Sequence, residues 1–178
     1  MVRIAITACF VLLLAMPALA QEDYPKIQTT LGYANLGFPD LNTLETTRHH
    51  GFVNQTGFNL SKTWGLENYM GIYGLGTGVT LIADFFGGKA TYRFAKFAPY
   101  ASAGLGVGYF TASTSYGYGS QSSFATRYGA GFDIPINDSM AWKFEVTRMN
   151  FHIQTTSPTS SWTSGTNFAT GVVFTLAQ

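Results

Sequence analysis

The sequence has little charge, almost no cysteine and, after its first 20 residues, no long apolar run. Cys9 is the only cysteine and lies in a stretch that we expect to be removed, which excludes disulfides from the mature protein. Basic and acidic residues number ten and nine, a balance that favours neither nucleic acid as a partner nor a disordered acidic tail. Charged residues make up 11% of the chain, whereas about 25% is usual for a soluble domain. We therefore expect much of the outer surface of the folded protein to contact something other than water.

The first 20 residues have the pattern of a secretory signal peptide. Arg3 supplies a positive charge, an apolar run follows, and Ala18-Leu19-Ala20 is a small-x-small cleavage site. We therefore predict a signal peptide over residues 1–20 and a single mature domain over residues 21–178. A lipoprotein signal ending at Cys9 is the alternative, but cleavage there would leave much of the apolar run on the product.

Aromatic residues and glycines are abundant in the mature part. Aromatics make up 16% of the chain, and there are 20 glycines. No mature segment is long and apolar enough to be a membrane-spanning helix. The other structure that can span a membrane is a closed β-barrel, which leaves no open sheet edge. The chain also ends in an alternating apolar run, as expected if its last strand pairs with its first.

The strand-like segments alternate with a period of two. In residues 101–109 and 127–134, bulky apolar side chains occupy one face, and glycine, hydroxyl or charged residues occupy the other. Residues 73–80 alternate in the same way, with Tyr73 and Leu75 on the bulky face. In a membrane barrel the bulky face contacts lipid and the small face fills a narrow lumen. A soluble barrel with the bulky face inside is the alternative, but it would expose rows of glycine.

We predict eight strands of about ten residues, a length that suits tilted membrane strands. Short connections at 65–68, 95–98 and 136–139 are expected at the periplasmic end, and a short turn near 82–84 breaks this pattern. Longer outer loops are expected at 37–50, 111–121 and 152–166. The predicted strands cover residues 26–36, 51–62, 70–81, 85–94, 99–110, 122–134, 140–151 and 167–176.

Aromatic residues fall near the ends of the predicted strands, where a membrane barrel carries its interfacial girdles. Those expected near the periplasmic end are Trp64, Tyr69, Phe94, Phe97, Tyr100, Trp142 and Phe174. Those expected near the outer end are Phe52, Phe85, Phe86, Tyr109, Phe110, Phe124, Phe151 and Phe168.

Three segments resemble a known family. Pro99-Tyr100-Ala101-Ser102-Ala103-Gly104-Leu105-Gly106-Val107-Gly108-Tyr109 is similar to the fifth strand of the small eight-stranded outer-membrane β-barrels, the family of the OmpA transmembrane domain and OmpX. Tyr128-Gly129-Ala130-Gly131-Phe132 and Trp142-Lys143-Phe144-Glu145 resemble its sixth and seventh strands. The resemblance implies an all-β, eight-stranded antiparallel up-and-down transmembrane barrel in the bacterial outer membrane.

The carboxyl-terminal segment resembles the signal that the barrel assembly machinery reads in such proteins. Its positions are Gly171, Phe174 and Leu176. The resemblance therefore implies the assembly machinery as a partner during biogenesis, and it covers essentially the whole mature chain. It indicates architecture strongly and activity weakly, because such barrels carry many roles.

By parity, six charged residues face the lumen and form the candidate site: Lys89, Arg93, Arg127, Asp133, Lys143 and Glu145. Asp133 and Lys143 lie at similar depth on neighbouring strands, and Lys89 could meet Glu145 across the lumen. One hypothesis is that these pairs plug the barrel, since buried charges need partners and eight strands leave no free channel. The other is a small ion-conducting pore with a slightly basic lining.

The sequence gives little support for an enzymatic activity. A lipid A deacylase needs a His-x-Ser pair on one strand, and neither His50 nor His152 has serine two positions on. His49, His50 and His152 fall in outer loops without metal-ligand spacing, so no metal and no cofactor are expected.

We therefore expect a monomeric, non-enzymatic barrel with a structural or surface-interaction role, whose outer loops are available to an extracellular ligand. Outer-membrane lipid and lipopolysaccharide are its expected surroundings. Arg148 has lipid-facing parity near the outer rim, where it would either extend toward lipopolysaccharide phosphates or merely mark a strand end.

Overall fold

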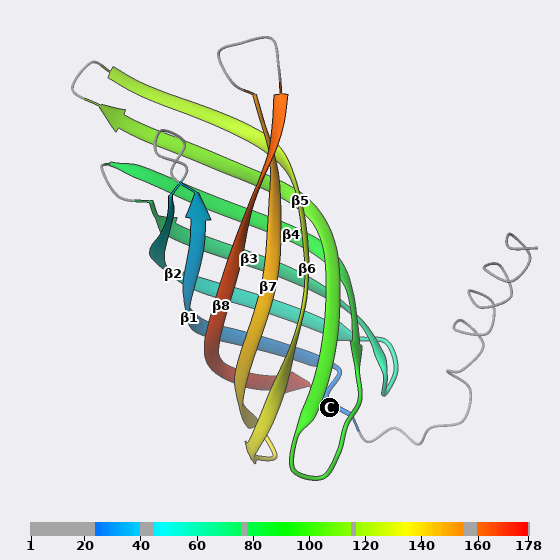
Figure 1. The fold of residues 1–178 in the computed structure, drawn as a ribbon. Coiled ribbons are helices and arrows are strands. Elements are labelled where there is room, and N and C mark those ends of the chain that lie inside the picture. Colours follow the sequence, from blue (N-terminus) through cyan, green and yellow to red (C-terminus); the bar gives the residue numbers. More distant parts are fainter. Residues whose placement is uncertain (1–23, 40–44, 76–77, 115–116, 155–159, 178) are drawn as a thin grey trace, which may run out of the picture.

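The computed structural model describes residues 24–39, 45–75, 78–114, 117–154 and 160–177. Each strand pairs antiparallel with the next, and β8 pairs with β1, so the sheet closes into a barrel (Figure 1). The predicted fold class is confirmed, whereas the predicted signal peptide lies outside the described residues. The strands are β1 (Ile27–Pro39), β2 (Thr46–Asn59), β3 (Trp64–Gly74), β4 (Val79–Thr91), β5 (Ala98–Thr114), β6 (Gly117–Asn137), β7 (Met140–Gln154) and β8 (Ser160–Ala177).

Short turns gather at one end of the barrel. The β2–β3 turn is closed by Leu60 N–H donating to Trp64 O at 2.9 Å, and the β4–β5 turn by Phe94 N–H donating to Phe97 O at 3.0 Å. The carboxyl terminus lies at this end too (Figure 1), where Lys26 N–H donates to Ala177 O at 2.8 Å. This is the end predicted to be periplasmic.

The β3–β4 hairpin lies at the opposite end and corrects the prediction for this region. β3 begins at Trp64, so residues 65–68 are strand rather than turn. Residues 82–84, predicted as a turn, lie inside β4. The hairpin instead connects Gly74 to Val79, and Gly78 has a φ of 79°, a left-handed conformation that glycine adopts without a steric penalty.

The strands also extend far into the predicted outer loops. β1 reaches Pro39 and β2 begins at Thr46, so most of the predicted loop 37–50 is strand. Likewise, β5 and β6 occupy most of 111–121, and β7 and β8 take up much of 152–166. Residues 40–44, 115–116 and 155–159 of these predicted loops lie outside the described residues.

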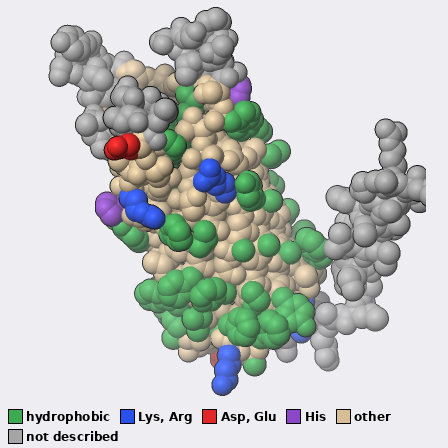
Figure 2. All heavy atoms as spheres, viewed as in Figure 1, with side chains coloured by type: hydrophobic (Ala, Val, Ile, Leu, Met, Phe, Trp, Pro, Cys, Tyr) green, Lys and Arg blue, Asp and Glu red, His purple; other side chains and the backbone are tan. Residues whose placement is uncertain are grey.

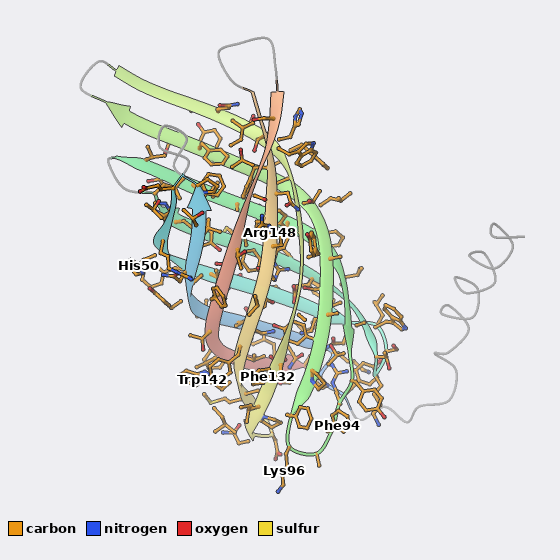
Figure 3. The ribbon with its side chains drawn as sticks, in the orientation of Figure 1. His50, Phe94, Lys96, Phe132, Trp142 and Arg148 are labelled. Atoms are coloured by element: carbon orange, nitrogen blue, oxygen red, sulfur yellow. The ribbon has the colours of Figure 1, made fainter. Side chains whose placement is uncertain are left out.

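Side chains alternate between the two faces as predicted for β5, β6 and β7. On β5, Leu105 and Val107 point outward and are 62% and 53% exposed, whereas Ser102 is buried inside. The outer surface therefore carries a band of hydrophobic side chains, which gathers over the lower half of the face shown in Figure 2. Phe132 and Trp142 belong to this band (Figure 3).

Glycine lets neighbouring strands approach closely. A Cβ at Gly106 would collide with the carbonyl group of Asp84 on β4, whereas one at Gly88 would meet nothing within 4 Å. Small residues on the inner face therefore set how tightly the sheet curls.

Several aromatic positions differ from the prediction, because aromatic side chains also pack inside the lumen. Tyr69, Phe85, Tyr100 and Phe151 are buried inside the barrel rather than placed in a girdle. Phe110 packs against the same core. Tyr73 and Leu75, predicted on the outward face, differ too: Tyr73 is fully buried, and Leu75 packs against the same core. Of the other predicted girdle residues, Phe174 is half-buried, and nine are exposed: Trp64, Phe94, Phe97, Trp142, Phe52, Phe86, Tyr109, Phe124 and Phe168.

Candidate functional site

Charged side chains from four strands converge inside the lower half of the barrel. Each lies on the inward face of its strand. We call these side chains, together with that of Tyr100 on β5, the lumen network: Glu67 on β3, Lys89 on β4, Arg127 and Asp133 on β6, and Lys143 and Glu145 on β7.

Arg127 lies at the centre of the lumen network. Its guanidinium contacts Glu67 at 3.1 Å and Glu145 at 2.5 Å, and therefore bridges β3 and β7 across the lumen. Its Nη1 also donates to Ser102 Oγ at 3.4 Å. The guanidinium carbon lies 4.0 Å from the ring centroid of Tyr69, a cation–π distance.

The two lysines share one carboxylate and one aromatic ring. Lys143 Nζ lies 3.3 Å from Asp133, and Lys89 Nζ lies 4.0 Å from both Asp133 and Glu67. Both lysines contact the ring of Tyr100, whose centroid lies 4.5 Å from Lys89 Nζ and 4.2 Å from Lys143 Nζ. The Tyr100 hydroxyl donates to Glu145 at 2.9 Å and so joins the lysine side to the arginine side.

The lumen network is electrically balanced. Three carboxylates, Glu67, Asp133 and Glu145, face three cations, and all six side chains are at most 8% exposed. Removing such groups from water is costly unless each charge finds a partner. Here every charged group has at least one partner of opposite sign, and the equal numbers leave the network without net charge.

A second, uncharged layer lies above the lumen network. Tyr69 and Tyr73 share a hydrogen bond of 2.5 Å, and Asn167 contacts both hydroxyls, at 3.1 and 3.2 Å. Beyond them lies a cluster of buried apolar side chains, which includes Leu36, Phe38, Leu81, Phe85, Met149 and Phe151.

The structure brings together five of the six predicted site residues. Asp133 and Lys143 pair as the sequence suggested. Lys89 does not pair with Glu145, because Glu145 is held by Arg127 and Lys89 instead contacts Glu67 and Asp133.

The prediction that Arg93 faces the lumen from the fourth strand is also wrong. β4 ends at Thr91, so Arg93 lies in the turn rather than on the strand, and it donates to the carbonyl of Lys62. Partial burial there lowers the pKa of its guanidinium from the usual value.

Glu67 is the acidic residue that the sequence prediction missed. The sequence prediction places it in a turn at 65–68, where strand parity does not apply. The alternation Gly65, Glu67, Tyr69, Gly71, Tyr73 along one face of β3 is the signal that would have found it.

The residues of the expected assembly signal lie on the last strand. Gly171 of β8 pairs with Gly32 of β1, where the two strands pack closely enough that a Cβ would meet backbone atoms. Leu176 is 64% exposed on the outer face near the periplasmic end.

The three histidines have separate neighbours in the structure. His49 contacts Thr47 at 2.9 Å, and His50 hydrogen-bonds the hydroxyl of Tyr33. His152 packs on Trp162 with ring centroids 5.2 Å apart. Among the described residues, no group of three or more possible metal ligands is present. Within the same residues, no helix is long and apolar enough to cross a membrane.

Comparison with known proteins agrees with this architecture. The family model described as "Outer membrane protein beta-barrel domain" matches residues 6–175. Neisserial surface protein A has a similar fold, with a TM-score of 0.67 and 11% identity over 84% of this chain and 96% of its own. Ail, the attachment invasion locus protein of Yersinia pestis, gives a TM-score of 0.56 at 13% identity, covering 83% of this chain and 96% of its own. The amino-terminal barrel of OprF from Pseudomonas aeruginosa gives 0.54 at 15% identity, covering 82% and 97%. No curated protein sequence matches the chain significantly.

Proposed function

The chain belongs to the outer membrane protein beta-barrel domain family, and from this premise we propose that it is a closed, non-conducting barrel with a structural or surface-interaction role. As a family member it resides in the bacterial outer membrane, with the hydrophobic outer band facing lipid. The proposal concerns what the barrel does there, and it includes no enzymatic activity and no cofactor.

The lumen network is the observation that carries this proposal. Ion pairs run from Glu67 through Arg127 to Glu145, and two lysines lie 4.5 and 4.2 Å from the ring centroid of Tyr100. An eight-stranded barrel has an interior just wide enough for side chains. A paired, buried and neutral set of charges fills that space, which supports a plug better than a basic conducting lining.

The opposite end of the barrel supports a contact role. β5, β6 and β8 have 17, 21 and 18 residues, whereas about 9–11 residues are enough to cross the hydrocarbon region. In Figure 1, the β5–β6 hairpin extends beyond the other strands at this end. The excess length would hold residues such as Ser120 and Gln121 away from the membrane, where a partner could reach them.

Conductance across a planar lipid bilayer tests the proposal. The folded wild type is expected to give no single-channel steps. A variant that empties the centre of the lumen, Glu67→Ala/Arg127→Ala/Glu145→Ala, is expected to give measurable current once its folding has been verified. A control variant, Lys62→Gln/Lys96→Gln, changes charge only at the turns and should stay silent. Steps of similar size from the wild type would contradict the plug and favour the pore.

A further inference from the structure

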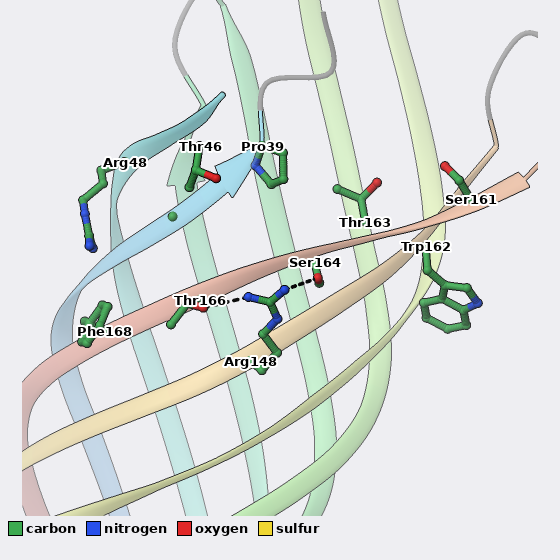
Figure 4. A pocket seen from close by; sticks show the side chains of 11 residues that line it. Pro39, Thr46, Arg48, Arg148, Ser161, Trp162, Thr163, Ser164, Thr166 and Phe168 are labelled. Carbon is green, nitrogen blue, oxygen red and sulfur yellow. Dashed lines mark hydrogen bonds between the residues drawn. The ribbon is translucent and has the colours of Figure 1, made fainter. Parts of the chain in front are cut away.

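A groove with a volume of about 840 Å³ lies on the outer surface where the first and last strands meet. Pairing between β1 and β8 ends at Gly37 and Thr166, whereas β1 continues to Pro39 and β8 begins at Ser160. The β1–β2 and β7–β8 hairpins therefore separate above this point and leave a hollow between them (Figure 4). We call this hollow the outer arginine groove.

Two arginines form the walls of the groove. The strand registers place Arg148, Thr166, Gly37 and Arg48 in one continuous row across β7, β8, β1 and β2. The two arginines are thus three strands apart, or about 14 Å between backbones at the usual strand spacing. Gly37 has no side chain to fill the floor between them, which is why the surface is hollow here.

Both guanidinium groups are held in place by uncharged partners. Arg148 donates to Thr166 Oγ1 at 2.9 Å and to Ser164 Oγ, as Figure 4 shows. Arg48 donates to Asn35 Oδ1 at 3.0 Å, and its guanidinium carbon lies 5.3 Å from the ring centroid of Phe168. The ion pairs found among the described residues all lie inside the barrel and include neither arginine.

The row lies at the outer edge of the hydrophobic band. Arg148 is eight residues beyond Met140, the first residue of β7. At about 3.4 Å per residue and a tilt of about 40°, this places it about 20 Å above the periplasmic turn, where an apolar band about 25 Å tall approaches its limit. The outward residues just below the row are apolar and exposed, with Val146 at 47% and Phe168 at 45%.

We propose that the outer arginine groove binds the phosphorylated headgroup of lipid A in the outer leaflet. Arg48 and Arg148 each take one phosphate, because guanidinium and phosphate match in geometry and form charge-assisted hydrogen bonds. Two guanidinium groups that line one groove of about 840 Å³ suit a headgroup with two phosphates better than a single small anion. The acyl chains of the lipid would then run down over Phe168, Tyr33 and Phe52, which are exposed on the same face.

A competing explanation is that each arginine simply extends toward water at the membrane boundary. That explanation requires neither the shared row nor the hollow at Gly37, and it predicts no preference among headgroups. Lys62 and Lys96 provide matched controls for the two arginines, because these basic residues lie in turns at the opposite end of the barrel.

Native mass spectrometry of the folded protein in zwitterionic detergent tests the proposal, with diphosphoryl lipid A as the probe. Arg48→Gln and Arg148→Gln should each weaken lipid A binding about tenfold, and the double variant about a hundredfold. Lys62→Gln/Lys96→Gln, which removes the same charge elsewhere, should bind as the wild type does. Gly37→Leu should also weaken binding, because a Cβ there has only ordinary contacts at 3.5 Å and the larger side chain fills the hollow without changing charge.

Three results would overturn the proposal. One is equal binding by the wild type and the double arginine variant, and another is equal loss in the two double variants. The third is displacement of lipid A by inorganic phosphate at comparable concentration, which would make the groove a site for the free anion. Monophosphoryl lipid A should bind with intermediate affinity. Gel mobility before and after boiling shows that each variant is folded, and conductance is measured separately, so the plug and the lipid site can fail independently.

Discussion

Replacing Arg127 with methionine tests how the lumen network stabilises the barrel. Arg127 contributes two buried ion pairs, at 3.1 and 2.5 Å, and stacks over the ring of Tyr69. Methionine fills most of the same volume but carries no charge. The substitution therefore leaves two carboxylates inside the barrel without their nearest cation.

The expected magnitude follows from what remains around those carboxylates. Glu145 retains hydrogen bonds from Tyr100 at 2.9 Å and from Gln55 at 3.0 and 3.1 Å. Among the cations of the described residues, Glu67 retains Lys89 alone, at 4.0 Å. Removing one member of a buried ion pair typically costs about 3–5 kcal/mol, so the free energy of unfolding should fall by about that amount. With an m-value of about 2 kcal/mol/M in urea, the midpoint of unfolding should move down by about 2 M.

Urea unfolding in lipid vesicles, followed by tryptophan fluorescence, measures this change. Trp64, Trp142 and Trp162 are exposed on the outer surface and should report loss of the lipid environment. Arg148→Met is the matched control, because it makes the same substitution on the outer face, where the change should stay below about 1 kcal/mol.

A triple variant separates loss of charge pairing from loss of packing. Glu67→Gln/Arg127→Met/Glu145→Gln removes the charges together and should regain at least half of the lost stability, since replacing a whole buried ion group is often close to neutral. A loss below about 1 kcal/mol for Arg127→Met, or a triple variant no more stable than the single one, would refute the reasoning.

Three further predictions concern the glycine contacts, the outer face and Tyr100. Gly106→Ala should lower folding yield in vesicles, because its Cβ would collide with β4, whereas Gly88→Ala should fold normally; equal yields would contradict the close approach. Val146→Arg, at an outward position that is 47% exposed, should cost about 2–4 kcal/mol in urea unfolding if this face contacts lipid, and a neutral effect would argue for a water-facing surface. Tyr100→Phe should cost about 1.5–3 kcal/mol through its lost hydrogen bond to Glu145, and a stability equal to the wild type would show that the bond contributes nothing.

The architecture could be predicted because one side of each strand is chemically distinct from the other along much of the chain. On β5 the inner side carries Ser102 and a row of glycines, and the outer side carries Leu105 and Val107. Such alternation predicts strands and faces directly. The pairing of Asp133 with Lys143 followed in turn from the short β6–β7 connection, which places the two residues opposite each other in register.

The prediction failed where both faces are apolar. In the upper half of β4, Leu81 and Phe85 point inward while Ile82 and Phe86 point outward, so the alternation disappears from the sequence. Without that alternation, the sequence suggests that Asp84 belongs to a turn. It is instead an exposed carboxylate on the outer face, hydrogen-bonded by Asn68 Nδ2 at 2.7 Å, a partner from β3 that sequence alone does not reveal.

The outer arginine groove was partly visible in the sequence. Arg148 stood out because a charge at a lipid-facing position is unusual. Its counterpart Arg48 did not, because it had been assigned to the loop 37–50. The two are brought into one row only by closure of the barrel between β1 and β8, a contact between residues far apart in the chain.

Thiol accessibility at Ser102 tests most directly whether the lumen network excludes water. The mature protein is expected to contain no cysteine, so Ser102→Cys, which is buried beside Arg127, and Ser139→Cys, which is exposed in a turn, can each be labelled alone. In the folded barrel, a small charged thiol reagent should modify position 139 rapidly and position 102 only after unfolding. Labelling of both positions at similar rates, while gel mobility shows the barrel folded, would mean that water fills the lumen and that the plug does not exist.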